Sequence, residues 1–245
     1  LNEAINEVSY RDILKGINMT LPKGSFISLV GESGCGKSTI AGILAGKNKG
    51  YRGHITIGGI PLNDVNEKDL MNHVVLVRHN SYLFKGTVED NLRMAHPDAT
   101  KQELEAVLEK VNLLGFLNTQ DGLQTKLLEK ASNLSVGQYQ RLAIARALLK
   151  KNVSVYIFDE AASNIDIESE ELIMNVIHEL AKTKTVLLIS HRLANVVKSD
   201  AIYFLQDGEI KENGTHEELM KLNGAYQHLY ASQIALENYG KEGTE

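Results

Sequence analysis

A glycine-rich segment that ends in a lysine and two hydroxyl residues carries the clearest chemistry in this sequence. It matches the phosphate-binding loop pattern at every required position, as Gly31-Glu32-Ser33-Gly34-Cys35-Gly36-Lys37-Ser38-Thr39. The glycines let successive backbone N–H groups turn toward one anion, and a helix that begins here points its N-terminus at the same place. Lys37 adds a positive charge for the β- and γ-phosphates of a nucleotide, and the Ser38 hydroxyl can bind Mg²⁺. We therefore predict that all nine residues line a nucleotide-phosphate site.

Two adjacent carboxylates follow an apolar run later in the chain. The run Val153–Phe158 has the length of a buried strand, and Asp159 and Glu160 come directly after it. Asp159 is placed as a Mg²⁺–water ligand, and Glu160 to hold or polarise an attacking water as a general base. An acidic pair at a strand end can also be merely solvated. The phosphate loop in the same chain favours the catalytic interpretation.

Short apolar runs that alternate with helical patterns place these residues in an α/β fold. Phe26–Val30 precedes the phosphate loop and has the length of a buried strand, and apolar residues recur at helical spacing after Lys37. Thr185–Ser190 is a further strand run, and His54–Ile57 alternates as a half-buried strand does. Strands that alternate with helices predict a parallel sheet with crossover helices.

Helical patterns replace this alternation in the middle of the chain. Thr100 and Glu103 form a capping-box pattern before an apolar helix face, and Thr215 with Glu218 forms another near the C-terminus. We therefore expect one domain over residues 1–245, with an α/β core at about 1–80 and 151–235 and a helical insertion at about 81–150.

Composition narrows the classes of partner. The chain has 26 basic and 31 acidic residues and a formal charge of -5, which speaks against nucleic acid as a partner. Its one cysteine, Cys35, cannot form a disulfide within the chain, which favours a reducing compartment. No apolar run approaches the roughly 18 residues that a membrane span needs. If the domain acts at a membrane, we expect the spanning part to lie elsewhere.

Residues 134–148 resemble the signature segment of the ABC transporter ATPases. Leu134-Ser135-Val136-Gly137-Gln138 is similar to the usual Leu-Ser-Gly-Gly-Gln, and the residues after it are also typical. Independently, Ser135 and Gln138 form a capping box at a helix start, and such a helix end offers free N–H groups to an anion. The resemblance implies that Ser135, Gly137 and Gln138 contact the γ-phosphate of ATP held by the phosphate loop of a second subunit.

Other motifs follow in the family order and the resemblance covers nearly the whole chain. Ser163–Asp166 resembles the D-loop, and Ile189–Arg192 resembles the switch motif, whose histidine, here His191, contacts the γ-phosphate. Residues 83–92 and 208–226 resemble exporters more than importers. The resemblance implies a P-loop NTPase (RecA-like) core with an N-terminal antiparallel β subdomain and an inserted α-helical subdomain.

Four positions depart from the family pattern. Val136 replaces a signature glycine, although Gly137, whose close approach to phosphate matters most, is retained. His79 stands where a glutamine usually approaches Mg²⁺, so it is either a metal-site residue or part of a surface loop. Lys126 stands where exporters commonly have glutamate. Tyr10 is a candidate to stack on adenine, or else it only packs in a strand.

The function implied by the resemblance is ATP hydrolysis by two associated ATPase domains, coupled to export through transmembrane domains at the cytoplasmic face of the cell membrane. ATP and Mg²⁺ are the expected ligands, and Lys37, Glu160 and His191 the catalytic residues. A weakly hydrolysing subunit of a heterodimer is an alternative, motivated by Val136 and His79. A non-transport ABC ATPase acting on DNA or ribosomes fits poorly, because the chain has one phosphate loop and a net negative charge.

Overall fold

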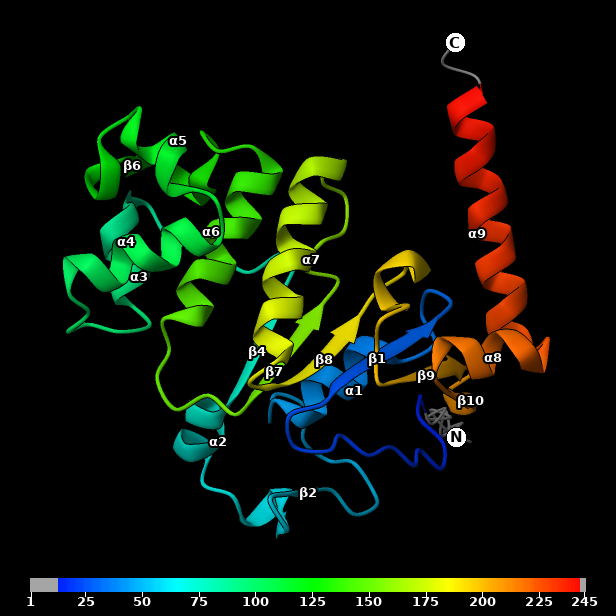
Figure 1. The fold of residues 1–245 in the computed structure, drawn as a ribbon. Helices are drawn as coiled ribbons and strands as arrows, with labels where there is room; N and C mark the ends of the chain where they lie inside the picture. Colours follow the sequence, from blue (N-terminus) through cyan, green and yellow to red (C-terminus); the bar gives the residue numbers. More distant parts are fainter. Residues whose placement is uncertain (1–12, 243–245) are drawn as a thin grey trace, which may run out of the picture.

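A six-stranded β-sheet forms the centre of the computed structural model, which describes residues 13–242 (Figure 1). The strands lie in the order β10-β9-β1-β8-β7-β4, and all neighbours are parallel except β10, which pairs antiparallel with β9. Their bounds are β1 Phe26–Gly31, β4 Val74–Arg78, β7 Val155–Asp159, β8 Thr185–Ile189, β9 Ala201–Gln206 and β10 Glu209–Gly214. The predicted parallel sheet is confirmed.

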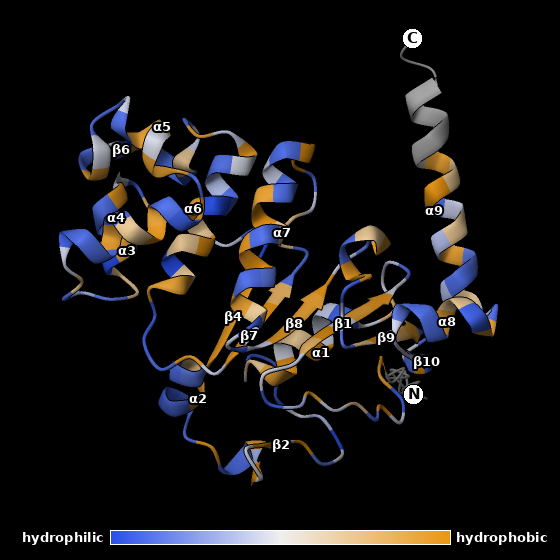
Figure 2. Ribbon diagram, viewed as in Figure 1, coloured by the Kyte–Doolittle hydropathy of each residue, from blue (hydrophilic) through white to orange (hydrophobic). Residues whose placement is uncertain are grey.

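Helices cover both faces of this sheet, and alternation along β1 shows why. Phe26 belongs to a core that also contains residues of α7 (Ile167–Ala181), whereas Ile27 belongs to a second core together with residues of α1 (Lys37–Leu44). Because both faces are covered, β1 and β8 are buried along their whole length. Figure 2 accordingly shows the strands as continuous hydrophobic runs and the helices as two-sided.

The helical part lies between β4 and β7 in sequence and shares its core with the sheet. Leu104, Leu108 and Leu142 from these helices pack in the same buried cluster as Phe158 of β7. The small pair β5 (Gly86–Thr87) and β6 (Lys126–Leu127) joins the start of the helical part to the segment before its last helix. The helices are α3 Val88–Arg93, α4 Lys101–Lys110, α5 Leu114–Asn118 and α6 Val136–Leu148.

Capping boxes start several of the helices. Thr100 caps α4 with Glu103, and Thr215 caps α8 (His216–Leu222) with Glu218, as predicted. In each box the threonine hydroxyl accepts from the third helical N–H, and the glutamate carboxylate accepts from the threonine N–H. Asn66 caps the short helix α2 (Glu67–His73) in a simpler way, accepting from the N–H of Lys68.

The antiparallel part before α2 is small within the described residues. A hairpin of β2 (Thr56–Ile57) and β3 (Ile60–Pro61) pairs with no strand of the central sheet, and residues 13–25 form no strand. The predicted strand His54–Ile57 is thus shorter than expected. Gly53, Gly58 and Gly59 take positive φ angles of 123°, 59° and 82°, which bend the chain away from an extended course on both sides.

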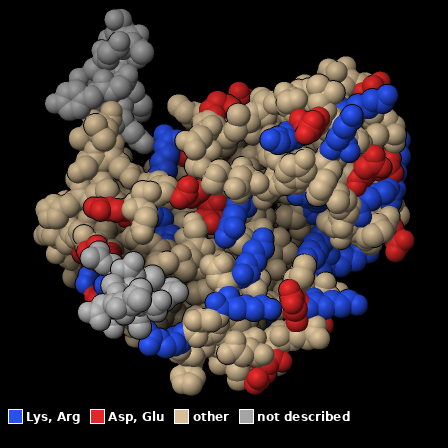
Figure 3. Space-filling view, turned by 180° about the vertical axis from the view of Figure 1, so that it is seen from behind, with Lys and Arg blue, Asp and Glu red and all other residues tan. Residues whose placement is uncertain are grey.

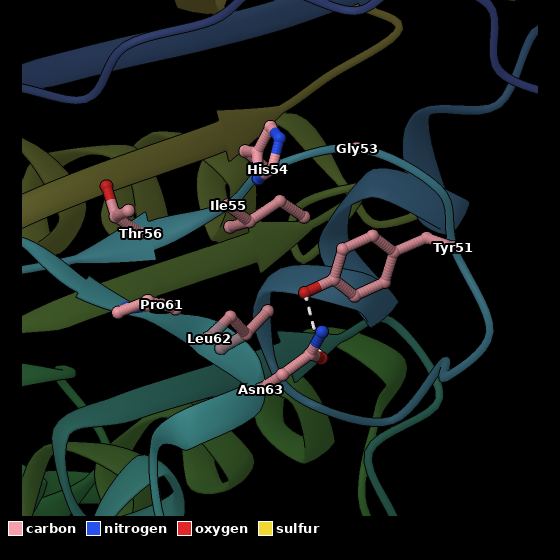
Figure 4. Close-up of a pocket in the computed structure, with 8 residues that line it drawn as sticks. All are labelled: Tyr51, Gly53, His54, Ile55, Thr56, Pro61, Leu62 and Asn63. Carbon is pink, nitrogen blue, oxygen red and sulfur yellow. Dashed lines mark hydrogen bonds between the residues drawn. The ribbon is translucent and has the colours of Figure 1, made fainter.

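A small hollow lies beside this hairpin (Figure 4). Its volume is about 90 Å³, and the hydroxyl of Tyr51 donates across it to Oδ1 of Asn63 at 3.1 Å. Ligand pockets commonly measure roughly 300–1,000 Å³. The hollow is therefore too small for a nucleotide, and no residue of the phosphate loop lines it.

The C-terminal helix α9 (Ala225–Glu242) stands away from the body, and Figure 1 shows it projecting beyond the sheet. Its base is fixed, because the Glu212 carboxylate of β10 accepts from the N–H groups of Ala225 and Tyr226 at 2.5 and 3.1 Å. Within residues 13–242, α9 included, no helix combines the length and the apolar character that a membrane span requires.

We predict that His178 makes stability fall at acidic pH. Burial lowers the pKa of His178 below its ordinary value, Lys198 lowers it further, and Nε2 is buried without a hydrogen-bond partner among the described residues. The unfolded chain then binds more protons than the folded chain below about pH 6.5, so stability is present above this pH and lost as pH falls. Urea midpoints at pH 7.5 and 5.5 should differ less in His178→Leu than in the unchanged chain. An equal difference in both proteins, with the exposed His228→Leu as control, would contradict this assignment.

Candidate functional site

The phosphate loop lies between β1 and α1, as predicted. Gly31 and Gly36 have φ angles of 149° and 112°, and each needs to be glycine because of its neighbours. A Cβ on Gly31 would lie 2.0 Å from the carbonyl oxygen of Leu205, and one on Gly36 would lie 2.6 Å from a methyl of Leu14. Gly36 caps α1 without any side-chain hydrogen bond, so the first N–H groups of α1 stay open toward the loop.

The side chain of Lys37 folds back over this loop. Its Nζ donates to the carbonyl oxygens of Gly31 and Glu32 at 2.9 and 2.7 Å and lies 3.7 Å from the sulfur of Cys35. Lys37 is only 4% exposed, and within the described residues it has no carboxylate partner. The ammonium group is thus held at the centre of the loop by neutral groups, which suits a site for an anion.

Ser38 and Asp159 meet at the edge of this loop. The Ser38 hydroxyl donates to Oδ1 of Asp159 at 3.0 Å, and Asp159 is the buried last residue of β7. A hydroxyl and a carboxylate are the hard oxygen ligands that Mg²⁺ prefers. The donor set therefore fits the predicted metal, and two residues predicted to hold it are brought together.

Arg78 also reaches Asp159, and sequence reasoning missed it. Parallel pairing of β4 with β7 sets Arg78 beside Asp159, and Nε of Arg78 lies 3.3 Å from Oδ2 of Asp159. His79, the residue predicted for this site, follows in a turn with an exposed side chain that makes no hydrogen bond or ion pair within residues 13–242. A cationic residue at the end of one strand and an acidic residue at the end of another are the sequence signal that could have pointed to Arg78.

Glu160 and His191 face each other across two neighbouring strands. Parallel pairing aligns Asp159 of β7 with Ile189 of β8, so the residues that follow both strands come close. Nε2 of His191 lies 2.6 Å from Oε1 of Glu160. Glu160 has a left-handed φ of 55°, held by its N–H donating to the carbonyl of Ile189 and by the Ser163 hydroxyl donating to its own carbonyl. The structure thus brings the predicted base and the predicted switch histidine together.

The signature residues start α6 on the helical part of the chain. The Ser135 hydroxyl accepts from the N–H of Gln138 at 3.1 Å, and Oε1 of Gln138 accepts from the N–H of Ser135 at 3.0 Å, so the predicted capping box is confirmed. Val136 is 62% exposed. Within the described residues, no hydrogen bond joins Ser135, Gly137 or Gln138 to the phosphate loop.

Gly137 is required by packing inside the chain, a reason that sequence reasoning did not give. A Cβ at this position would lie 2.1 Å from the Ser169 hydroxyl and 3.2 Å from a carboxylate oxygen of Asp166. Asp166 caps α7 by accepting from the N–H of Ser169 at 2.8 Å, and this hydrogen bond is the main reason why the pKa of Asp166 is lowered. The signature glycine therefore packs closely against the start of α7, which the last residue of the D-loop caps.

Helix α6 also holds the loop that follows β4. The Tyr139 hydroxyl donates to the carbonyl of Ser81 at 2.7 Å and accepts from the N–H of Leu83 at 3.1 Å. Gln140 donates to the carbonyl of Arg78, and Arg146 donates to the next part of the same loop, the carbonyl of Tyr82. Gln140 is 2% exposed, so its amide needs a polar partner inside the protein, and the carbonyl of Arg78 provides one.

Comparisons with known proteins agree with this geometry. A family model described as ABC transporter matches residues 14–163, more than half of the chain. The chain belongs to the ABC transporter family. An uncharacterised ABC transporter ATP-binding protein of Haemophilus influenzae is 46% identical over 224 residues, covering 91% of this chain and 40% of that protein.

Exporters stand among the relatives of this ABC chain. A Staphylococcus aureus relative, provisionally named a multidrug export ATP-binding/permease protein, is 39% identical over 90% of this chain and 38% of its own length. The solved structure of a bacterial Atm1-family ABC exporter with ATP bound superposes with a TM-score of 0.86 at 33% identity, covering 91% of this chain and 39% of that one. The chain spans about two fifths of these relatives. The P-loop NTPase fold and the exporter-type resemblance are confirmed.

The remaining predicted site residues of this ABC domain have simpler surroundings. Glu32, Ser33 and Gly34 are exposed at the tip of the phosphate loop, and Cys35 and Thr39 are half-buried beside it. Tyr10, the candidate for adenine stacking, lies outside the described residues. The roles of all these residues in binding stay predictions.

We expect Tyr139→Phe to loosen the loop that follows β4. The change removes one hydroxyl that satisfies both the carbonyl of Ser81 and the N–H of Leu83, and Leu83 is fully buried. Leaving buried backbone groups unpaired costs about 1–3 kcal/mol. Urea unfolding should show this loss, and hydrogen exchange of the Leu83 amide should accelerate. Tyr82→Phe removes an exposed hydroxyl and serves as the control; equal effects from the two changes would refute the prediction.

Gly137→Ala should destabilise the domain although alanine favours helices. The added methyl meets Ser169, and overpacking of this kind typically costs about 1–3 kcal/mol. Adding Ser169→Gly removes the clashing atoms, so the double variant should lose less stability than the two single changes added together. Gly115→Ala is the matched control, because a Cβ there meets nothing within 4 Å and should be neutral or stabilising. Strict additivity in a thermal unfolding cycle would rule out direct contact.

Proposed function

We propose that this domain binds ATP with Mg²⁺ and hydrolyses it between two associated copies or relatives, and that this powers export through transmembrane domains. The observation that carries the proposal is the contact between Nε2 of His191 and Oε1 of Glu160, which lie 2.6 Å apart. Glu160 directly follows Asp159, the residue that bonds to Ser38. A base, a switch histidine and a metal-binding pair then share one edge of the sheet with the phosphate loop.

Each candidate residue has a distinct task in this proposal. The Lys37 ammonium exchanges its contacts to the Gly31 and Glu32 carbonyls for phosphate oxygens. Ser38 and Asp159 hold Mg²⁺, which when bound supplies charge neutralisation at the phosphates. Glu160 positions water and takes up its proton, and His191 donates a hydrogen bond toward the γ-phosphate. Most of the rate enhancement comes from positioning and charge.

Pairing of two domains is supported by where the signature lies. Ser135, Gly137 and Gln138 stand at the start of α6 and share no hydrogen bond with the phosphate loop within residues 13–242. The open helix end is therefore free to serve the nucleotide of a second domain. The relative with ATP bound and the ATP-binding/permease relatives support an assembly with a second ATPase domain and transmembrane domains.

We assign coupling to a membrane part to the loop that α6 holds and to the residues directly after it. Tyr82 and Phe84 are half exposed and pack edge to face, with ring centroids 4.8 Å apart, and Leu128 is also exposed. Asn91 fixes this segment by accepting from the N–H of Phe84 and donating to its carbonyl. This exposed apolar surface supports contact with transmembrane domains, and with it the proposed position at the cytoplasmic face of the membrane.

A weakly hydrolysing subunit of a heterodimer is the second candidate. The ion pair of Arg78 with Asp159 favours it, because a cation competes with Mg²⁺ for the same carboxylate. The exposed side chain of Val136 at the signature points the same way.

ATPase activity of the purified chain against its concentration separates the two candidates. For a self-pairing hydrolase, activity should rise faster than linearly with protein. Glu160→Gln should then lower turnover by roughly 10²–10⁴-fold while ATP binding persists, because a general base contributes about that factor. Glu217→Gln, an exposed change on α8, is the control. Tight ATP binding without turnover at any concentration would exclude self-pairing hydrolysis and favour the heterodimer.

A further inference from the structure

A glutamine of the C-terminal helix bridges the backbone on both sides of Arg192, at the end of the switch motif. Nε2 of Gln233 donates to the carbonyl of His191 at 2.6 Å, and Oε1 of Gln233 accepts from the N–H of Leu193 at 2.9 Å. Both ends of one side-chain amide are therefore used on one short loop, which lies about forty residues earlier in the chain. A side chain that only filled space on α9 would need neither bond.

Helix α9 is fixed to the body before Gln233 and is exposed after it. Tyr226, at its base, is fully buried, and its hydroxyl lies 2.8 Å from Nδ1 of His216. Gln233 stands about two helical turns further on. One turn beyond it, Leu236 is 72% exposed. Figure 1 shows that α9 projects beyond the sheet. Within residues 13–236, no side chain of α9 beyond Gln233 forms a hydrogen bond to the body of the domain.

The switch loop is held by two separate sets of contacts. On the side of α7, the buried Glu170 binds Arg192 and accepts from Nδ2 of Asn195 at 2.7 Å. On the side of α9, the backbone of His191 and Leu193 is held by Gln233. The His191 ring, which extends from this loop, is the group that meets Glu160 at 2.6 Å. A shift of the loop therefore changes the approach of the ring to Glu160.

We propose that Gln233 is a positioning residue for His191, so that α9 sets the geometry of the switch histidine. The inference rests on the proposed function, because His191 matters to hydrolysis only if the domain is an ATPase. Gln233 itself touches neither the nucleotide site nor Glu160; it acts through the backbone of the loop. Any partner that tilts α9 would move the Gln233 amide away from His191 and Leu193. ATP turnover would then change although the partner does not touch the nucleotide.

The test compares Gln233→Ala and Gln233→Glu with the unchanged chain. Glutamate keeps the acceptor for Leu193 but loses the donor to His191, so both variants should lower kcat, on the order of 10- to 100-fold for a misplaced catalytic group. The dissociation constant for ATP should stay within about twofold, because the phosphate loop is untouched. His228→Gln, an exposed change on α9, should leave both quantities unaltered. Gln233→Asn, which keeps both polar groups on a shorter arm, serves if the alanine variant fails to fold.

A second readout needs no hydrolysis. NMR of the nucleotide-free chain with labelled histidine rings, assigned by the signal lost in His191→Asn, reports the surroundings of His191. In Gln233→Ala this signal should move toward its position in Glu160→Gln, where the facing carboxylate is gone. A His191 signal that stays in place, or moves elsewhere, overturns the positioning role. If the unchanged chain has no turnover, self-pairing hydrolysis fails on its own, and the ring signal still decides the role of Gln233.

Discussion

The buried ammonium group of Lys37 is the feature on which the rest of the site depends. Taking such a charge out of water costs roughly several kcal/mol unless other groups replace its hydration shell. The carbonyls of Gly31 and Glu32 do this at 2.9 and 2.7 Å, and Gly31 permits it because any side chain there would collide with Leu205. Carbonyl groups carry no net charge, so the loop keeps a positive charge beside the open end of α1. An anion is the partner that completes this arrangement.

Strand register brings the other groups to that positive charge. Because β4, β7 and β8 are parallel and in register, Arg78, Asp159 and Ile189 end at one edge of the sheet, and Glu160 and His191 follow them. Helix α6 then ties the same edge to the helical part of the chain, since Tyr139 and Gln140 bond to the loop after β4. One sheet and one helix thus decide where four functional groups lie, and the loops between them only complete the geometry.

The local parts of this arrangement could be predicted from sequence, because their causes lie within a few residues. The strand, loop and helix around Lys37, and the capping boxes of Thr100 and Ser135, depend on neighbouring residues and were found. The hairpin near His54 came out shorter than expected, because glycines on both sides end its strands. Arg78, Tyr139 and Gln233 were missed because their partners lie far away in the chain, and no periodicity marks a polar side chain that bonds to a distant backbone.

The candidate catalytic groups already satisfy one another, and this decides what a nucleotide must do. Lys37 is bonded to its own loop, Ser38 to Asp159, and His191 to Glu160, so each group gives up an internal contact when it turns to a ligand. The free energy of binding is then the difference between new and old contacts, rather than the sum of the new ones.

Glu160 is also held at a left-handed φ of 55°, which costs roughly 1–2 kcal/mol and persists only while the backbone contacts to Ile189 and Ser163 last. A site of this kind favours a ligand that engages all three pairs together, because breaking an internal contact costs free energy that only new contacts to the ligand offset. The proposed ligand, ATP with Mg²⁺, would meet that condition, because its phosphates and metal are suited to Lys37, to Ser38 with Asp159, and to His191.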